Sequence, residues 1–208
     1  VFIQHMMDNY NINQTTLKLL GLYTSDYRKS LHLREVARET KVDVKAVQLQ
    51  LRKLEKINVL SSALKGRNKE YYLNLNNSIT RYYMMLAETF ASINYLASNF
   101  VIKKIISEIG DKTEGIIVLF GSFAREEATE ESDIDIFVLA ERKSNKSGFA
   151  EVGSLIGREI NVKSTNKKRF LKGLEDGDPL MREVVSSHIV LKGVDEFCDI
   201  MWRYYARR

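Results

Sequence analysis

The chain has 208 residues, a length that allows one large domain or two small ones. Its formal net charge of +5 is uneven, because residues 1–76 carry 13 basic and 7 acidic residues while the remainder is nearly neutral. The single cysteine, Cys198, excludes an intramolecular disulfide and a multi-thiolate zinc site, and it fits a reducing, cytoplasmic location. The histidines show no metal-ligand spacing, no apolar run is long enough to span a bilayer, and we expect no secretory signal. Composition thus favours two modules, of which the basic one is suited to a polyanion, although a charge of this size also fits an ordinary solvated surface.

The first third of the chain predicts three short helices. They cover residues 12–22, residues 33–39 and the segment from Asp43 to Lys56, where the Asp43 carboxylate is suited to cap the first turn. The third helix has an apolar stripe at three- and four-residue spacing, made of Val44, Val47, Leu51 and Leu54. Asn58 follows where a left-handed residue commonly ends a helix.

Two extended segments, residues 59–65 and 69–75, flank the turn Gly66-Arg67-Asn68 and predict a β-hairpin with a basic tip. Three helices followed by a basic hairpin resemble a winged helix-turn-helix DNA-binding domain over about residues 10–76. The resemblance implies a recognition helix in the major groove of double-stranded DNA and a wing that contacts phosphates. The implied DNA-binding residues are Lys45, Gln48 and Arg52 on the helix and Lys65, Arg67 and Lys69 on the wing. The alternative is a winged helix that makes only protein contacts.

Residues 77–100 predict a linking helix with a regular apolar seam. The seam has alternating four- and three-residue spacing and consists of Ile79, Tyr83, Leu86, Phe90, Ile93, Ala97 and Phe100. A protein that reads a two-fold DNA site needs a dimer, so we expect either a homodimer through this seam or packing of the seam within its own domain. The pattern changes near Phe100, where a separate helix of the following domain is expected.

The residues best suited to carry chemistry follow a short apolar strand at Gly115–Phe120. Gly121-Ser122 comes next, and after ten further residues Asp133 and Asp135 lie two apart on a second strand, so their carboxylates face the same side. Two adjacent carboxylates repel unless a cation neutralises them, and Mg²⁺ shared with substrate phosphates is the usual solution. A glycine lets the backbone approach a phosphate, and a helix beginning near Ser122 offers N–H groups to an anion. The sequence therefore predicts a nucleoside triphosphate at Gly121-Ser122, with Mg²⁺ or Mn²⁺ held by the two aspartates.

The stretch GSFAREEATEESDIDIFVLA closely resembles the minimal nucleotidyltransferases of the DNA polymerase β superfamily. The resemblance implies transfer of a nucleoside monophosphate to an acceptor hydroxyl with two metal ions, and a third carboxylate on a later strand. Arg125 matches the arginine that usually follows Gly-Ser, as a phosphate ligand or as a surface side chain. The third acidic position is Asn161, whose amide oxygen binds Mg²⁺ weakly and cannot take a proton. Glu159 faces the same side and is a possible substitute.

The later stretch GREINVKSTNKKRFLKGLEDGDPLMREVVSSHIVLKG resembles nucleotidyltransferase-domain proteins that carry an N-terminal winged helix and are described as transcriptional regulators. It predicts helices at 167–175 and 179–186, a strand at 188–191 and a final helix that buries Cys198. The expected fold is α+β: a winged helix-turn-helix domain at 1–76, a linking helix at 77–100, and a nucleotidyltransferase fold at 101–208 with a small mixed β-sheet flanked by helices.

Three functions stay open on the sequence alone. The first is a DNA-binding transcriptional regulator whose nucleotidyltransferase domain binds a nucleoside triphosphate and Mg²⁺ as ligands. The second is an active nucleotidyltransferase that uses the winged helix for targeting. The third is an interaction protein with a degenerate site.

Overall fold

The computed structural model describes residues 12–141 and 146–206, and the chain divides into two compact units. Unit 1 comprises residues 1–87 and 205–208, and unit 2 comprises residues 88–204. The division falls inside one long helix, α5 (Ser78–Ser98), whereas the expected segments 1–76, 77–100 and 101–208 remain a prediction. In the described residues, no helix is both long and apolar enough to cross a membrane.

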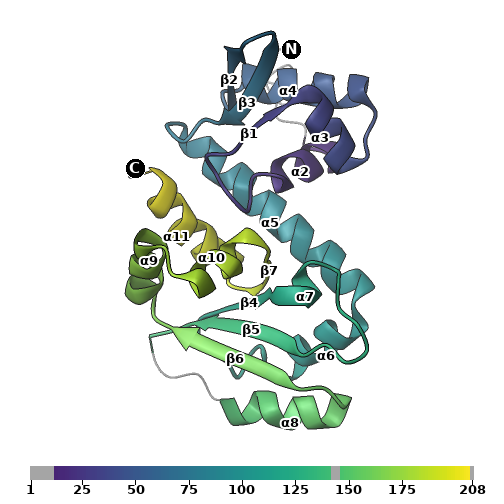
Figure 1. The fold of residues 1–208 in the computed structure, drawn as a ribbon, viewed down its shortest axis with the longest axis vertical. Coiled ribbons are helices and arrows are strands. Elements are labelled where there is room, and N and C mark those ends of the chain that lie inside the picture. The colour runs from purple at the N-terminus through teal and green to yellow at the C-terminus, as the bar shows by residue number, and fades with distance from the viewer. Residues whose placement is uncertain (1–11, 142–145, 207–208) are drawn as a thin grey trace, which may run out of the picture. The chain divides into compact units, whose positions relative to one another are not determined.

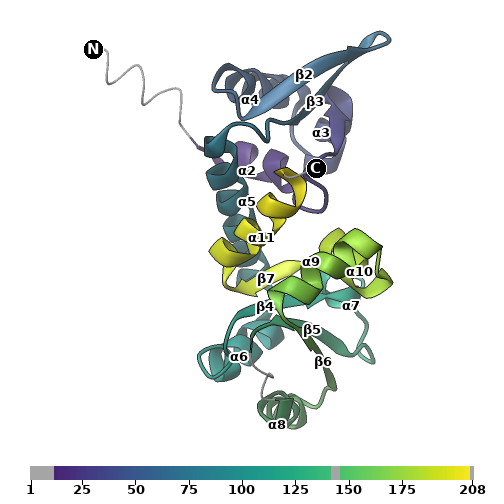
Figure 2. The ribbon, with the colours of Figure 1, turned by 90° about the vertical axis from the view of Figure 1, so that its left-hand side faces the viewer.

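Unit 1 combines short helices with a three-stranded antiparallel sheet. Its elements before α5 are α2 (Gln14–Gly21), β1 (Ser30–His32), α3 (Leu33–Thr40), α4 (Val44–Lys56), β2 (Leu60–Lys65) and β3 (Asn68–Leu73). The strand order is β1-β3-β2, and β2 and β3 form the expected hairpin, which projects from the rest of unit 1 in Figure 2. Strand β1 was not predicted from the sequence, because a strand of three residues leaves too few positions for an alternating pattern.

Local sequence signals explain where α4 begins and ends. The Asp43 carboxylate accepts the backbone N–H groups of Lys45 and Ala46, at 2.9 and 3.3 Å, which confirms the predicted cap. Asn58 adopts a left-handed φ of 58°, as expected for a residue that ends a helix. The predicted stripe is wrong at one position, since Val44 is 44% exposed. Gln50 is buried instead, and its side-chain oxygen accepts a hydrogen bond from Thr16.

Unit 2 is a mixed α/β unit around a four-stranded sheet. Its elements after α5 are α6 (Phe100–Ile109), β4 (Ile116–Phe120), α7 (Gly121–Ala124), β5 (Ile134–Leu139), α8 (Lys146–Ile156), β6 (Ile160–Thr165), α9 (Lys167–Asp176), α10 (Pro179–Ser186), β7 (Ile189–Lys192) and α11 (Val194–Ala206). The strand order is β6-β5-β4-β7, with β5 and β6 parallel and the other pairs antiparallel. The expectation of a small mixed sheet flanked by helices is confirmed.

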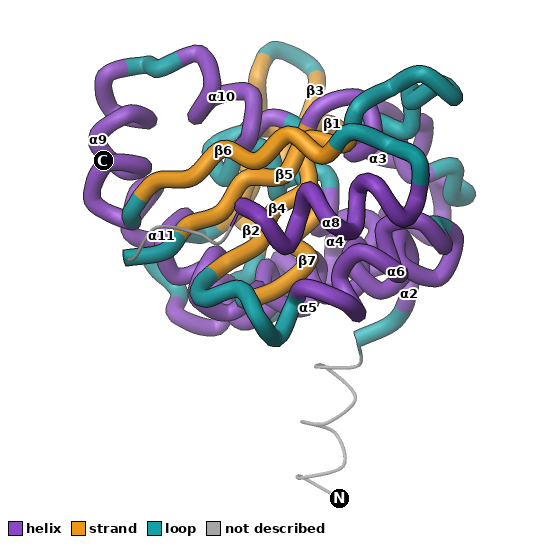
Figure 3. The backbone as a smooth tube through the Cα atoms, turned by 90° about the horizontal axis from the view of Figure 1, so that it is seen from below, coloured by secondary structure: helices purple, strands orange, loops and turns teal. Residues whose placement is uncertain are grey.

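The two faces of this sheet bury different residues, because successive side chains of a strand alternate. One face packs against α6 and α8 through a cluster that includes Ile117, Ile134 and Ile136 (Figure 1). On the opposite face, the ring of Phe137 lies 5.8 Å from that of Phe170 in α9, and α10 packs on β4. Figure 3 shows the strands side by side with α8 in front of them. Asp135 alternates with Ile134 and Ile136, so it lies on the α9–α10 face.

Buried polar contacts tie strand β7 to α5 within unit 2. Nε2 of His188 lies 3.1 Å from a carboxylate oxygen of Glu88, and both side chains are almost fully buried. Burial favours a neutral imidazole, but attraction to Glu88 and hydrogen bonds to Glu88 and to the Val185 carbonyl outweigh it and raise the pKa of His188. Ser92 in α5 also donates a hydrogen bond to the Val190 carbonyl, at 2.6 Å. Cys198 is buried, as predicted.

The predicted apolar seam on α5 is split between buried and exposed positions. Tyr83 is only 5% exposed and belongs to the core, whereas Ile93 and Phe100 are 61% and 78% exposed. Ile79 and Leu86 are also exposed. Ile79, Leu86 and Ile93 lie on α5, whereas Phe100 is the first residue of α6, so the large exposed apolar residues of the seam on α5 are the first three alone.

Candidate functional site

Gly121 and Asp135 meet at the end of the central strand pair. Phe120, the last residue of β4, pairs with Asp135 of β5, so the next residue, Gly121, lies against the aspartate. Gly121 has a left-handed φ of 71°, and a Cβ built on it would lie 3.2 Å from Cγ of Asp135 and closer still to Oδ2. The carboxylate therefore occupies the space that a side chain at Gly121 would need, and only glycine fits both the conformation and the contact.

Asn161 lies on β6, the strand that pairs with β5 on the side opposite β4. It is opposite Asp135 in the parallel β5–β6 ladder, and its side-chain nitrogen lies 3.3 Å from Oδ2 of Asp133. Asp133 is exposed, while Asp135 and Asn161 are half-buried. The structure places these three residues side by side, and Asn161 serves here as a hydrogen-bond donor to a carboxylate. Glu159 is exposed, and its backbone carbonyl accepts the N–H of Ile134, at 2.9 Å.

The pKa of Asp135 depends on a further carboxylate, Glu183, that was not predicted from the sequence. Burial raises the pKa of Asp135, and the negative charges of Glu183 and Asp133 raise it further, against smaller opposing effects of Asn161 and Lys163. Glu183 comes from α10, which packs on β4. No spacing in the sequence links Glu183 to the Asp-x-Asp pair, because the two are brought together only by the docking of α10.

Arg125 lies at this site but is engaged with carboxylates. Its Nε lies 2.8 Å from Oε2 of Glu127 and its Nη1 lies 3.7 Å from Oε1 of Glu183. The hydrogen bond to Glu127 is the main cause of the raised pKa of Arg125. A phosphate at this position has to compete with both carboxylates for the guanidinium.

The helix expected after Ser122 is only a single turn. It is α7, which spans four residues, and Ser122 is half-buried within it. A dipole summed over four peptides is small, so the expected anion binding by a helix terminus is not supported. Gly121 itself is buried against Asp135, so the expected approach of a phosphate to its backbone stays a prediction.

The donor set fits a divalent cation only when a ligand completes it. Two carboxylates, Asp133 and Asp135, face the same side, but no group of three His, Cys, Asp or Glu side chains is arranged to hold a metal among residues 12–141 and 146–206. Mg²⁺ is commonly held by one or two carboxylates together with substrate phosphates. These residues thus suit one cation shared with a bound phosphate.

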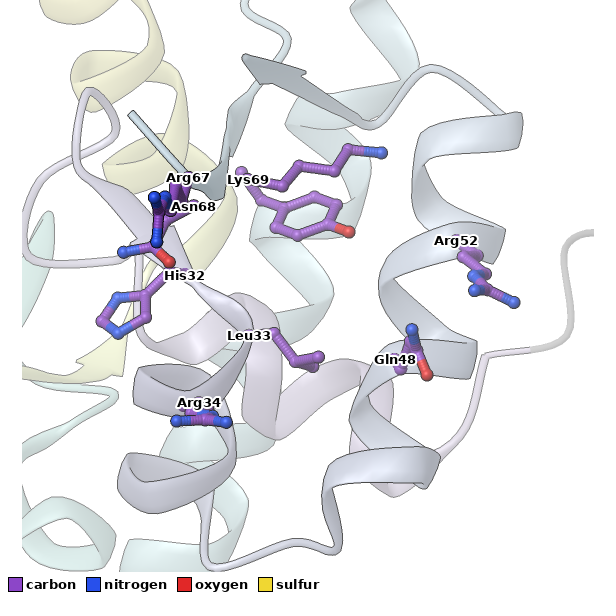
Figure 4. Close-up of a pocket in the computed structure, with 9 residues that line it drawn as sticks. His32, Leu33, Arg34, Gln48, Arg52, Arg67, Asn68 and Lys69 are labelled. Atoms are coloured by element: carbon purple, nitrogen blue, oxygen red, sulfur yellow. The ribbon is translucent and has the colours of Figure 1, made fainter. Parts of the chain in front are cut away.

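In unit 1, α4 and the hairpin enclose a basic cavity of about 560 Å³ (Figure 4). Four of the predicted DNA-binding residues line it: Gln48 and Arg52 from α4, Arg67 from the β2–β3 turn, and Lys69 from β3. Lys45 and Lys65 are exposed and do not line it. His32 and Arg34 join the lining from β1 and α3, and the sequence analysis missed both because the short β1 strand places them there.

Carboxylates hold the two lysines of the hairpin. Lys69 lies 2.9 Å from Glu55 in α4, and its ammonium lies 5.1 Å from the centroid of the Tyr71 ring. The hydrogen bond to Glu55 raises the pKa of Lys69. Lys65 lies 3.5 Å from Glu70 on the paired strand. These contacts orient the lysines but also reduce the net positive charge of the hairpin.

Comparison with known proteins identifies the domain in unit 2. Residues 102–197 match the family model described as "Polymerase beta, Nucleotidyltransferase", which confirms the predicted nucleotidyltransferase domain. The chain has no significant match among curated proteins.

Two solved structures show weak similarity. One is described as "Crystal structure of the toxin-antitoxin with AMP-PNP", with 19% identity and a TM-score of 0.35 over 50% of this chain and 79% of that chain. The other is human N-acetylserotonin methyltransferase in complex with SAM, with 14% identity and a TM-score of 0.29 over 52% of this chain and 35% of that chain. Neither similarity is strong enough to establish a shared fold.

Proposed function

We propose that the nucleotidyltransferase domain binds a nucleoside triphosphate together with Mg²⁺ or Mn²⁺, and that unit 1 is a winged-helix domain that binds double-stranded DNA. The whole chain then acts as a DNA-binding transcriptional regulator with a nucleotide ligand. The observation that carries the nucleotide site is the direct approach of Gly121 to the carboxylate of Asp135, with Asp133 beside it.

Each residue of the nucleotide site has a role that its chemistry supports. Asp133 and Asp135 hold the cation, which supplies positive charge to the triphosphate. Gly121 leaves space beside the backbone for the carboxylate of Asp135, and the Ser122 hydroxyl is available as a donor. Asn161 orients Asp133 by its hydrogen bond. Arg125 is the cation that turns from Glu127 and Glu183 towards a phosphate.

The proposal of a winged helix is supported by the order of elements in unit 1. The helices α2, α3 and α4 are followed by the β2–β3 hairpin, and β1 pairs with β3 to complete a three-stranded sheet. The basic cavity between α4 and the hairpin brings Arg52 and Arg67 to one surface. Such an arrangement suits phosphate contacts that position a recognition helix on DNA.

The experiment for the nucleotide site is a binding titration with the full chain. We expect each of the four triphosphates, or a subset of them, to bind by calorimetry only when Mg²⁺ or Mn²⁺ is present, and Asp135→Asn to abolish the metal-dependent part. Absence of metal-dependent binding for all four nucleotides would contradict the proposal.

The experiment for DNA binding is fluorescence anisotropy with a random-sequence duplex at several salt concentrations. Arg52→Gln and Arg67→Gln are each expected to weaken binding and to reduce the salt slope by about 1, because one phosphate contact is lost. Lys18→Gln removes the same charge from the exposed side of α2 and is the matched control. If all three variants weaken duplex binding equally, the effect comes from the net charge of the protein and not from contacts of Arg52 and Arg67. A change in duplex affinity on addition of Mg²⁺ and nucleotide supports the regulatory role.

An active nucleotidyltransferase is the second candidate, favoured by Glu183 as a further carboxylate near Asp135. In that reaction an acceptor hydroxyl oxygen bonds to the α-phosphorus, the bond to the β-phosphate oxygen breaks, and pyrophosphate leaves. The hydroxyl proton needs an acceptor, which Asn161 cannot be. Radiolabelled triphosphates with Mg²⁺ test for transfer, and label that is lost in Asp133→Ala supports this candidate.

A homodimer through residues 77–100 remains part of the proposal. It is supported by the exposed apolar residues of α5, of which Ile93 is among the most exposed. A two-fold DNA site requires two copies of the reading helix, which a dimer supplies.

A further inference from the structure

The segment that joins Gly121-Ser122 to Asp133 is exposed and has no regular structure of its own. We name residues 125–132 the connector; its residues up to Glu131 are all exposed. Within it, a turn is closed by the Ser132 N–H donating to the Thr129 carbonyl, at 3.2 Å. An exposed segment of this kind samples many conformations unless another part of the protein holds it. Asp133 follows it directly, so the position of this carboxylate depends on the connector.

Arg158 holds the end of the connector that precedes Asp133, whereas Arg125 at its other end contacts Glu183 of α10. Nη1 of Arg158 lies 3.2 Å from the carbonyl oxygen of Thr129, 2.8 Å from that of Glu130 and 3.2 Å from that of Ser132. A guanidinium is always charged and presents donors in a fixed plane, so it suits a set of carbonyl oxygens better than a neutral side chain does. The carbonyl of Ser132 belongs to the peptide bond that precedes Asp133.

Arg158 also contacts α7, the helical turn that contains Gly121 and Ser122. Its guanidinium carbon lies 5.6 Å from the ring centroid of Phe123, the residue after Ser122. The side chain thus touches α7 at one end of the connector and the Thr129–Ser132 turn at the other.

The backbone around Arg158 is itself fixed. Its N–H donates to the Gly153 carbonyl, at 3.0 Å, and the next residue, Glu159, accepts the N–H of Ile134, at 2.9 Å. Strand β6 with Asn161 begins directly after, so Arg158 is anchored to the sheet that carries Asp135. A rigid anchor is what a residue needs in order to position an exposed segment.

We propose that Arg158 is a positioning residue for the nucleotide site: by holding the connector to the sheet, it sets the position of Asp133 and thereby the affinity for a divalent cation and a triphosphate. The inference rests on the proposed nucleotide binding. Removal of a residue that holds a metal ligand in place, without binding the metal itself, typically weakens metal binding by about 10- to 100-fold. Arg158 acts through backbone carbonyls and does not itself bind the nucleotide.

The test compares Arg158→Met and Arg158→Lys with the wild type in the full chain. Binding of Mn²⁺ in the presence of ATP or each of the other triphosphates is followed by electron paramagnetic resonance. We expect the half-saturating Mn²⁺ concentration to rise about 10-fold in Arg158→Met. Arg158→Lys replaces the guanidinium by a charged ammonium. Its half-saturating Mn²⁺ concentration is expected to lie between those of the wild type and Arg158→Met. The circular dichroism spectrum and the melting temperature are expected to be unchanged, which a general loss of structure would not produce.

The control and the structural readout separate positioning from stability. Arg169→Met makes the same chemical change at an exposed position of α9 and is expected to leave Mn²⁺ binding unchanged. Hydrogen exchange of residues 126–133 is expected to accelerate in Arg158→Met and not in Arg169→Met, while circular dichroism reports the fold. If Arg158→Met does not fold, Arg158→Lys carries the test.

The outcomes distinguish this inference from the function on which it rests. A wild type that binds no Mn²⁺ with any triphosphate overturns the proposed function and the inference with it. A wild type that binds, together with a folded Arg158→Met or Arg158→Lys that has the same Mn²⁺ dependence and the same exchange rates, overturns the inference alone.

Discussion

The substitution Gly121→Ala tests the geometry of the nucleotide site most directly. Alanine at a left-handed φ of 71° costs about 1–2 kcal/mol of stability relative to glycine. Its Cβ would also lie within 3.3 Å of both Cγ and Cβ of Asp135, with Oδ2 nearer still. To restore ordinary contact distances the carboxylate has to move by about 1 Å. The side chain of Asp135 rotates more easily than the backbone shifts, so the loss is expected mainly in binding.

We expect Gly121→Ala to fold, with a free energy of unfolding lower by about 1–2 kcal/mol, and to bind Mg²⁺ with nucleotide about 10- to 100-fold more weakly. Calorimetric titration and urea unfolding measure the two quantities. Gly66→Ala is the matched control, because Gly66 has a similar φ of 62° and no heavy atom within 4 Å of a Cβ built there. The control is expected to show the same backbone cost and unchanged nucleotide binding. Wild-type affinity in a folded Gly121→Ala would refute the argument that this contact sets the position of Asp135.

Three further predictions address other parts of the molecule. Asn161→Asp adds a further negative charge beside Asp133 and Asp135, so Mg²⁺ is expected to raise its melting temperature more than that of the wild type; gain of label transfer from a triphosphate would identify the absent carboxylate as the limit on chemistry. Glu88 raises the pKa of the buried His188. The pair therefore contributes its full stabilisation of the folded state below pH ~6.5, and this contribution is lost as the pH rises through the folded-state pKa of His188. His188→Gln is therefore expected to cost about 3 kcal/mol in urea unfolding at pH 6 and less at pH 9, and a pH-independent difference would argue against this account. Ile93→Asp places a charge on the exposed seam of α5 and is expected to convert a homodimer into a monomer in light scattering; a dimer that survives rules out this seam.

Local sequence patterns predicted most elements of both units, but β1 (Ser30–His32) and α8 (Lys146–Ile156) were not among them. The Asp43 cap and the left-handed Asn58 are confirmed, because each depends on the conformation of a few neighbouring residues. The alternation around Asp135 predicted which neighbours are buried, since a strand has a fixed period. Where a pattern is too short, as in β1, or sits at a helix end, as at Val44, local signals failed.

The sequence by itself determined that Gly121, Asp133 and Asp135 come together, because adjacent strands in one sheet require it. The resemblance to the nucleotidyltransferases predicted that Asn161 stands at the position of a third carboxylate, and in the structure Asn161 is opposite Asp135 in the β5–β6 ladder. Only the tertiary structure decided that Glu183 sits near Asp135 and that Arg158 holds the connector. Both contacts join segments distant in the chain through the docking of helices and loops on the sheet. No periodicity encodes such contacts, because they depend on how whole elements pack and not on the conformation of any one of them.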